Sequence, residues 1–231
     1  MGYFPSVEKT LPARPPIPAP PVPARRGGIR VANLLTLSRI ALAPVFAWAF
    51  LQGHVDGSAR WAQWTALFVA ISFELTDAYD GWVARARNEV SDFGKIVDPL
   101  ADGISRFTVF LCFLAAGYTS IWAVLIVFWR DAVVSFLRVM AGKEGVALAA
   151  RPFGKAKAIV QAVAILAILV FGLVPVFPEG GLAGFHLWWV DDPERHREIA
   201  QWLMWGVAFV TAASLVDYLR GNREVLRRLD V

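Results

Sequence analysis

The residues with the clearest chemical potential lie between Asp77 and Asp102, where four aspartates occur at fixed spacing as long apolar segments end. An ionised carboxylate is costly at membrane depth, so with four of them either metal ions bind or some of the acids stay protonated. The run contains no His or Cys, so its ligand atoms are oxygens, which favours Mg²⁺ or Mn²⁺ over Zn²⁺. Two such ions would nearly neutralise four carboxylates and could clamp a phosphoryl group during displacement. The predicted metal ligands are Asp77, Asp80, Asp98 and Asp102.

Two other interpretations of the four aspartates stay open. The acids could pair with Arg85, Arg87 or Lys95 as solvated charges at the end of a helix. They could also line a cation or proton pathway, as intramembrane acids do in transporters. A transporter would carry paired internal repeats or broken helices, and neither is clear in the sequence.

The composition is that of a membrane protein. Of the 231 residues, 57% are hydrophobic, with ten Trp and sixteen Phe, which exceeds the apolar content of an average soluble domain. Six membrane-spanning helices of about 20 residues each fit in this length. We therefore expect an all-α, polytopic membrane protein with six transmembrane helices. The expected spans are 31–51, 61–83, 94–117, 119–140, 153–177 and 199–219.

Helical spacing arranges the aspartates as two stripes. In the second span, Asp77, Asp80 and Gly81 lie at i, i+3 and i+4, on one face. In the third span, Asp98 and Asp102 are one turn apart, again on one face. The link between these spans is short, so we expect them to be antiparallel neighbours whose acidic faces meet.

Basic residues predict the orientation of the spans. They concentrate before the first span, between the second and third, between the fourth and fifth, and after the sixth. Because cytoplasmic loops are enriched in Lys and Arg, we expect both termini and the aspartates on the cytoplasmic side of the cell (inner) membrane. Residues 1–28 are Pro-rich and predict a disordered tail, which leaves 29–231 as the membrane domain.

The aspartate run reads D-x2-D-G-x2-A-R-x8-G-x3-D-x3-D, with every position filled. This pattern resembles the signature of the CDP-alcohol phosphatidyltransferases. Similarity to that family continues in NLLTLSRIALAPVF from Asn33, in the segment Arg130–Gln161 and in SLVDYLRGNREVL near the end. The resemblance implies a six-helix membrane enzyme of phospholipid biosynthesis. Such an enzyme transfers a phosphatidyl group from CDP-diacylglycerol to an alcohol and releases CMP.

The resemblance also implies roles for individual residues. In that family the first three motif aspartates hold divalent metal, and these are Asp77, Asp80 and Asp98 here. The fourth, Asp102, also lies at the metal site and serves as general base, taking the proton of the acceptor hydroxyl as it attacks. The positions that match contacts to the CDP-linked donor are Asn33, Thr36, Gly81, Ala84, Arg85 and Ser91.

A second basic cluster surrounds the link between the fourth and fifth spans, in a region that is similar to phosphatidylglycerophosphate synthases. It consists of Arg130, Arg138, Arg151, Lys155 and Lys157. We expect Arg138, Arg151 and Lys155 to bind the phosphate of a phosphorylated acceptor such as glycerol 3-phosphate. The alternative is a contact with anionic lipid headgroups.

One position departs from that resemblance. Gly103 follows DPLAD, where phosphatidylglycerophosphate synthases usually carry Lys, and this weakens the assignment of the acceptor. Inositol phosphate is the next candidate, followed by serine, a second phosphatidylglycerol or another alcohol.

The remaining features predict ordinary roles. His54, His186 and His196 have no ligand spacing and are expected at the surface of loops on the far side. Small residues in the fifth and sixth spans suit packing of a homodimer, and ordinary helix contacts equally well. Cys112 is the single cysteine, so no disulfide framework or Cys-based zinc site is expected. The expected partners are the two substrates, the lipid bilayer and a second copy of the chain, and no nucleic acid.

Overall fold

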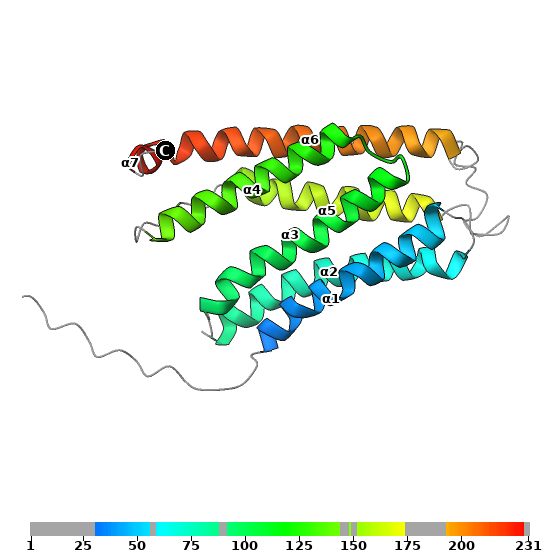
Figure 1. Cartoon of the computed structure of the whole chain (residues 1–231), viewed down its shortest axis with the longest axis horizontal. Coiled ribbons are helices and arrows are strands. Elements are labelled where there is room, and N and C mark those ends of the chain that lie inside the picture. The colour runs from blue at the N-terminus through cyan, green and yellow to red at the C-terminus, as the bar shows by residue number, and fades with distance from the viewer. Residues whose placement is uncertain are drawn as a thin grey trace, which may run out of the picture.

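The structure is a computed structural model that describes residues 31–55, 59–87, 92–143, 148, 152–173 and 193–228. The described residues form helices and no strand (Figure 1). The long helices are α1 (Val31–Phe50), α2 (Arg60–Arg87), α3 (Asp92–Ala115), α4 (Ile121–Lys143), α5 (Pro152–Leu173) and α6 (Pro193–Gly221). A short π-helix, η1 (Leu51–Val55), continues α1, and α7 (Arg223–Arg228) follows α6. The Pro-rich segment 1–28 lies outside the described residues.

The six predicted helical segments are confirmed, with shifts at their ends. α6 begins at Pro193, so the expectation of a loop up to Ile199 is wrong. A proline at the first helical position and Glu194 in the first turn both favour this start. α3 ends before Gly117, whose φ of 74° is left-handed. Tyr118 N donates to Phe113 O over 2.8 Å and Gly117 N to Leu114 O over 3.1 Å, a Schellman ending that needs glycine.

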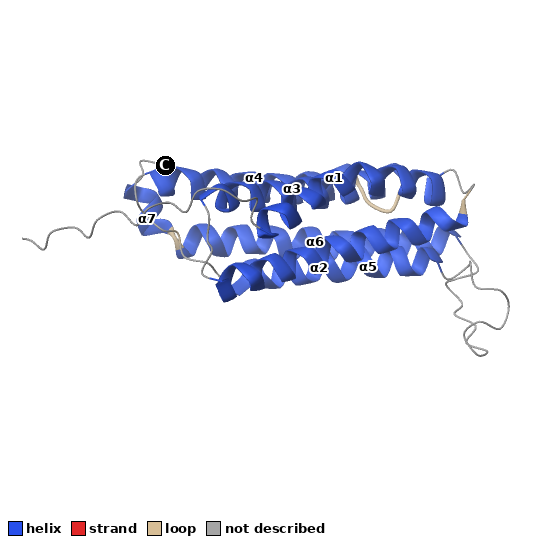
Figure 2. Ribbon diagram, turned by 90° about the horizontal axis from the view of Figure 1, so that it is seen from below, coloured by secondary structure: helices blue, strands red, loops and turns tan. Residues whose placement is uncertain are grey.

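Each long helix packs against two others, and the packed pairs close a ring. Around this ring the order is α1, α2, α5, α6, α4 and α3. All six run roughly along one long axis (Figures 1 and 2). Among the described residues, α1 packs against both α2 and α3. α2 also meets α3 through the ion pair between Glu74 and Arg106.

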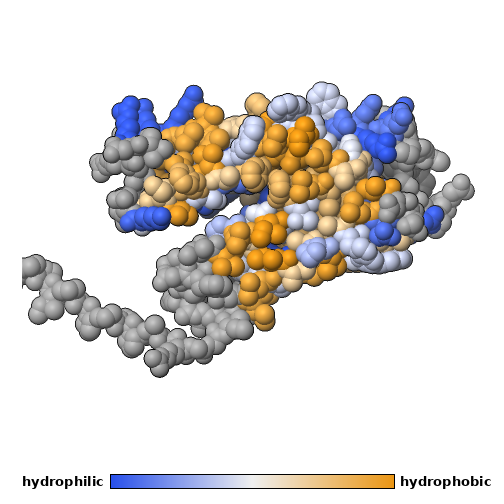
Figure 3. Space-filling view, in the orientation of Figure 1, coloured by the Kyte–Doolittle hydropathy of each residue, from blue (hydrophilic) through white to orange (hydrophobic). Residues whose placement is uncertain are grey.

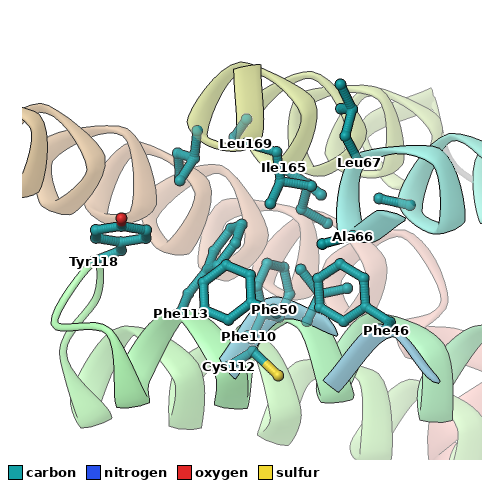
Figure 4. Packing of buried hydrophobic residues seen from close by; sticks show 14 of the residues in the cluster. Phe46, Phe50, Ala66, Leu67, Phe110, Cys112, Phe113, Tyr118, Ile165 and Leu169 are labelled. Atoms are coloured by element: carbon teal, nitrogen blue, oxygen red, sulfur yellow. The ribbon is translucent and has the colours of Figure 1, made fainter. Parts of the chain in front are cut away.

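Aromatic side chains of α1 and α3 form the centre of the core (Figure 4). Phe50 lies between Phe46 and Phe113, with ring centroids 5.8 and 5.6 Å apart. α5 adds Ile165 and Leu169 to the same cluster. Inside a bilayer such contacts stabilise by close packing rather than by removal from water. This core fixes α1 relative to α2 and α3, the two helices that carry the aspartates.

Within the part of the chain that the structure describes, three helices are long and apolar enough to cross a membrane, over Leu34–Val55, Pro152–Leu173 and Glu194–Gly221. Large apolar side chains also face outward, including Trp202 at 78% and Phe209 at 76% exposure. Figure 3 shows apolar surface across the middle of the bundle. Exposed apolar surface of this kind suits contact with lipid. α2, α3 and α4 are less apolar because they carry the acids and the buried basic residues.

Two histidines that were expected at the surface are packed inside the bundle instead. The ring of His54, in η1, stacks on Phe50 with centroids 4.4 Å apart, and His196 of α6 lies 4.9 Å from Tyr118. A Cβ added at Gly172 of α5 would lie 3.1 Å from His54 Nε2 and 3.3 Å from His196 Cε1. Gly172 therefore leaves room for both rings. This contact joins elements that are distant in the sequence, so residue spacing along the chain cannot predict it. His186 lies outside the described residues.

Candidate active site

The aspartate run lies at one end of the bundle. Figure 1 shows the end of α2 and the start of α3 at the same end as the start of α1. The side chains of Asp77, Asp98 and Asp102 are described. Several other predicted site residues lie in helices, but their side chains are outside the description: Asn33, Asp80, Gly81, Ala84 and Arg85. Ser91 and Arg151 lie outside the described residues altogether.

Helix α1 brings aspartates from two different helices together. Thr36 Oγ1 donates a hydrogen bond of 2.6 Å to Oδ1 of Asp98 on α3. One turn later, Arg39 Nη1 donates to Oδ1 of Asp77 on α2 over 2.8 Å. Both α1 side chains are only 1% exposed. Asp77 and Asp98 are therefore both oriented by one face of a third helix, α1.

Arg106 makes the corresponding contact with Asp102. Its Nη2 lies 2.6 Å and its Nε 3.3 Å from Asp102 Oδ1, and its Nη1 lies 3.8 Å from Glu74 Oε1 on α2. The sequence analysis did not predict a role in the site for Arg39, Glu74 or Arg106. Helical spacing could have indicated two of them, because Arg106 is one turn after Asp102 and Glu74 is three residues before Asp77.

These charged side chains surround a small pocket between α1, α2, α3 and α5. Its polar lining consists of Arg39, Glu74, Asp102, Ser105 and Arg106. Among the described side chains here, four carboxylates face two guanidinium groups. The carboxylates belong to Glu74, Asp77, Asp98 and Asp102. The excess of negative charge attracts a cation to this end of the bundle.

The ligand atoms suit a hard divalent ion, although the described side chains do not form a complete site. Asp77 is half exposed and Asp98 is exposed, so an ion can reach both. Within the described part of the chain, no three His, Cys, Asp or Glu side chains gather closely enough to hold a metal. The side chain of Asp80 is not among the described ones. Oxygen ligands alone fit Mg²⁺ or Mn²⁺.

A second buried charge cluster joins α4, α5 and α6. Lys157 Nζ lies 2.7 and 2.8 Å from the two carboxylate oxygens of Asp131. Arg130 reaches Asp131 over 2.9 Å and donates to Ser214 Oγ over 3.0 Å. Lys157 also lies within electrostatic reach of Asp102, so this cluster adjoins the aspartate site.

The two predicted acceptor residues that the structure describes lie outside this buried cluster. Arg138 and Lys155 are exposed, and the guanidinium of Arg138 lies 5.8 Å from the centroid of the Tyr218 ring. The buried cations of the basic region are instead Arg130 and Lys157. Residues 130 and 138 occur on one helix, and only packing distinguishes the buried arginine from the exposed one.

Comparison with known proteins accounts for the helices and the aspartate motif together. A family model described as CDP-alcohol phosphatidyltransferase matches residues 29–212. The chain belongs to the CDP-alcohol phosphatidyltransferase family. This phosphatidyltransferase is thus an enzyme of membrane phospholipid biosynthesis.

Several relatives carry the name CDP-diacylglycerol–glycerol-3-phosphate 3-phosphatidyltransferase, among them the following three. The protein of Treponema pallidum is 30% identical, over 87% of this chain and 93% of its own length. That of Bacillus subtilis is 29% identical, over 84% and 96%. That of Cereibacter sphaeroides is 35% identical, over 62% and 63%. The phosphatidyltransferase is therefore similar to the first two over nearly their whole length.

The second charge cluster of the phosphatidyltransferase is expected to support its fold. Replacing Asp131 with Asn leaves Arg130 and Lys157 buried without a carboxylate, which costs about 3–5 kcal/mol of stability for a broken buried pair. Denaturant unfolding in mild detergent measures this change. Adding Lys157→Met should recover part of the loss. The exposed Glu198→Gln substitution on α6 is the control. If Asp131→Asn lowers the stability no more than Glu198→Gln does, the structural role of Asp131 is contradicted.

Proposed function

We propose that this phosphatidyltransferase transfers the phosphatidyl group of CDP-diacylglycerol to glycerol 3-phosphate and releases CMP. The relatives that match over nearly their whole length are named for that reaction. The observation that carries the proposal is the orientation of signature aspartates from α2 and α3 by Thr36 and Arg39 of α1. It brings carboxylates that are distant in sequence to one cation-attracting end of the bundle.

The proposed reaction is a single in-line displacement. The acceptor hydroxyl gives its proton to Asp102 while its oxygen attacks the β-phosphorus of CDP-diacylglycerol. The bond between that phosphorus and the bridging oxygen breaks, and CMP leaves with the bond electrons. Mg²⁺ or Mn²⁺, with two ions held by the signature aspartates Asp77, Asp80, Asp98 and Asp102, would neutralise the pyrophosphate and the departing CMP.

The substrates are proposed to bind on either side of the aspartates. Donor contacts are assigned to six residues of α1, α2 and the α2–α3 link: Asn33, Thr36, Gly81, Ala84, Arg85 and Ser91. The acceptor phosphate is assigned to Arg138, Arg151 and Lys155, because guanidinium and ammonium groups form charge-assisted hydrogen bonds with phosphate. The exposure of Arg138 and Lys155 makes both accessible to a soluble acceptor.

The proposed membrane arrangement has six transmembrane helices, both termini in the cytoplasm and the active site facing the cytoplasm at the cell (inner) membrane. It is supported by the position of the α1 start and α7 at the same end of the bundle (Figure 1). The excess of basic residues at that end agrees with it. Residues 1–28 would form a tail outside the membrane domain 29–231, and two copies of the chain would form a homodimer.

An acceptor panel tests this proposal. Purified protein with CDP-diacylglycerol and Mg²⁺ or Mn²⁺ is offered glycerol 3-phosphate, inositol phosphate, inositol or serine, and CMP and lipid products are separated. We expect glycerol 3-phosphate to give the highest kcat/KM, because the exposed basic residues favour a phosphorylated acceptor. Preference for inositol phosphate would change the acceptor but keep the phosphate site. Preference for inositol or serine would contradict the roles of Arg138, Arg151 and Lys155.

A control separates the enzyme from a cation transporter. Asp98→Asn should lose CMP release with every acceptor, because Asp98 belongs to the signature. Wild-type protein that moves cations across vesicles but yields no CMP with any alcohol would contradict the transferase proposal.

A further inference from the structure

Arg106 is a buried cation in direct contact with the proposed base. Its side chain is 9% exposed, and both of its short contacts, from Nη2 at 2.6 Å and Nε at 3.3 Å, go to Oδ1 of Asp102. Oδ2 of Asp102 accepts no hydrogen bond from the residues that the structure describes. The contact is thus one-sided and leaves one carboxylate oxygen available.

The guanidinium of Arg106 also links α2 and α3. Its Nη1 lies 3.8 Å from Glu74 Oε1 on α2, while its other edge faces Asp102 on its own helix, α3. A guanidinium has its donors in a rigid planar fork. The two hydrogen bonds to Asp102 therefore orient the guanidinium and the carboxylate relative to each other, while Glu74 attracts the guanidinium across 3.8 Å without a hydrogen bond.

The residue that follows Asp102 does not supply a cation for its carboxylate. Gly103 has no side chain, and a Cβ added there would meet nothing within 4 Å. Arg106 is one turn along α3 from Asp102, where side chains of a helix meet on one face. A cation for Asp102 therefore comes from inside the bundle, beside the pocket that both residues line.

We propose that Arg106 is a positioning residue of the transfer reaction. It holds Asp102 by Oδ1, so that Oδ2 is the oxygen that receives the proton of the acceptor hydroxyl. This inference rests on the proposed function. Its physical basis is that a base held in one orientation does not have to be ordered during the reaction, and small misplacements of catalytic groups cost about 10²-fold in rate.

The experiment compares Arg106→Met and Arg106→Lys with wild type. Arg197→Met, which removes the same charge from an exposed position on α6, is the matched control. Full-length proteins in nanodiscs are assayed for kcat and KM by CMP release with glycerol 3-phosphate. Mn²⁺ binding is measured separately, by the paramagnetic resonance signal of the free ion, without substrates.

For Arg106→Met we expect kcat to fall by about 30-fold or more while KM for CDP-diacylglycerol changes by less than about threefold, since positioning acts on the transition state. Arg106→Lys should recover part of the rate, because it restores the charge but not the fork. Mn²⁺ should bind Arg106→Met as tightly as wild type or more tightly, because a competing positive charge has been removed. Arg197→Met should match wild type throughout.

Three results would overturn the inference. The first is an unchanged kcat in Arg106→Met. The second is a loss of kcat together with weaker Mn²⁺ binding, which would mean that Arg106 only maintains the helix arrangement. The third result applies if Arg106→Met does not fold. Arg106→Lys is then tested in its place, and a wild-type kcat of Arg106→Lys would overturn the inference. Failure of the proposed function is recognised differently, because wild type itself would then release no CMP.

Discussion

Replacing Asp102 with Asn is expected to lower kcat for CMP release by about 10²- to 10⁴-fold, the range associated with loss of a general acid or base. Asn has nearly the same shape as Asp, and its side-chain oxygen can still accept from Arg106. Glu74 remains 3.8 Å from the same guanidinium, so the local structure should persist. The measurement is the initial rate of CMP release from CDP-diacylglycerol with saturating glycerol 3-phosphate.

Two controls accompany this substitution. Glu198→Gln removes an exposed carboxylate of α6 and should leave the rate unchanged. The melting temperature of Asp102→Asn in detergent is expected to fall, because Arg106 loses its hydrogen-bonded carboxylate, so rates are compared below that temperature on folded protein. An Asp102→Asn protein that retains full metal-dependent CMP release would show that another group is the base.

Removal of divalent metal is expected to abolish nearly all activity. The site carries more carboxylates than cations among its described side chains, and the donor adds a pyrophosphate. Metal ions contribute several kcal/mol of charge stabilisation in such a transition state, and each 1.4 kcal/mol is about tenfold in rate. Chelation with EDTA should therefore lower the rate by more than about 100-fold, and Mg²⁺ or Mn²⁺ should restore it.

The number of ions is a separate result of the same experiment. Equilibrium dialysis should give two Mn²⁺ per chain for wild type and for Glu198→Gln, and fewer for Asp98→Asn. Full activity of the chelated, metal-free protein would contradict the metal role of the aspartates. One ion per chain with full activity would contradict only the two-ion arrangement.

The helices were predictable because their signals are local. Apolar runs and turn residues placed all six long helices, and the expected ends differed mainly where capping decided the boundary, as at Gly117 and Pro193. The arrangement of the helices was predicted less well. The short link predicted α2 and α3 as neighbours, but the sequence did not predict that α1 packs against both of them.

The candidate site, like the fold, could be predicted from the sequence only in part. The types and spacing of the aspartates predicted a site of oxygen ligands for a divalent metal, and they indicated the family, which is confirmed, because a motif on one pair of helices is a property of sequence alone. Only the tertiary structure decided which side chains orient these acids. The Arg39–Asp77 and Thr36–Asp98 contacts join residues 38 and 62 positions apart, and they depend on the packing of α1. Burial likewise separates Arg130 and Lys157 from the exposed Arg138 and Lys155, since charge alone does not reveal which cations lie inside the bundle.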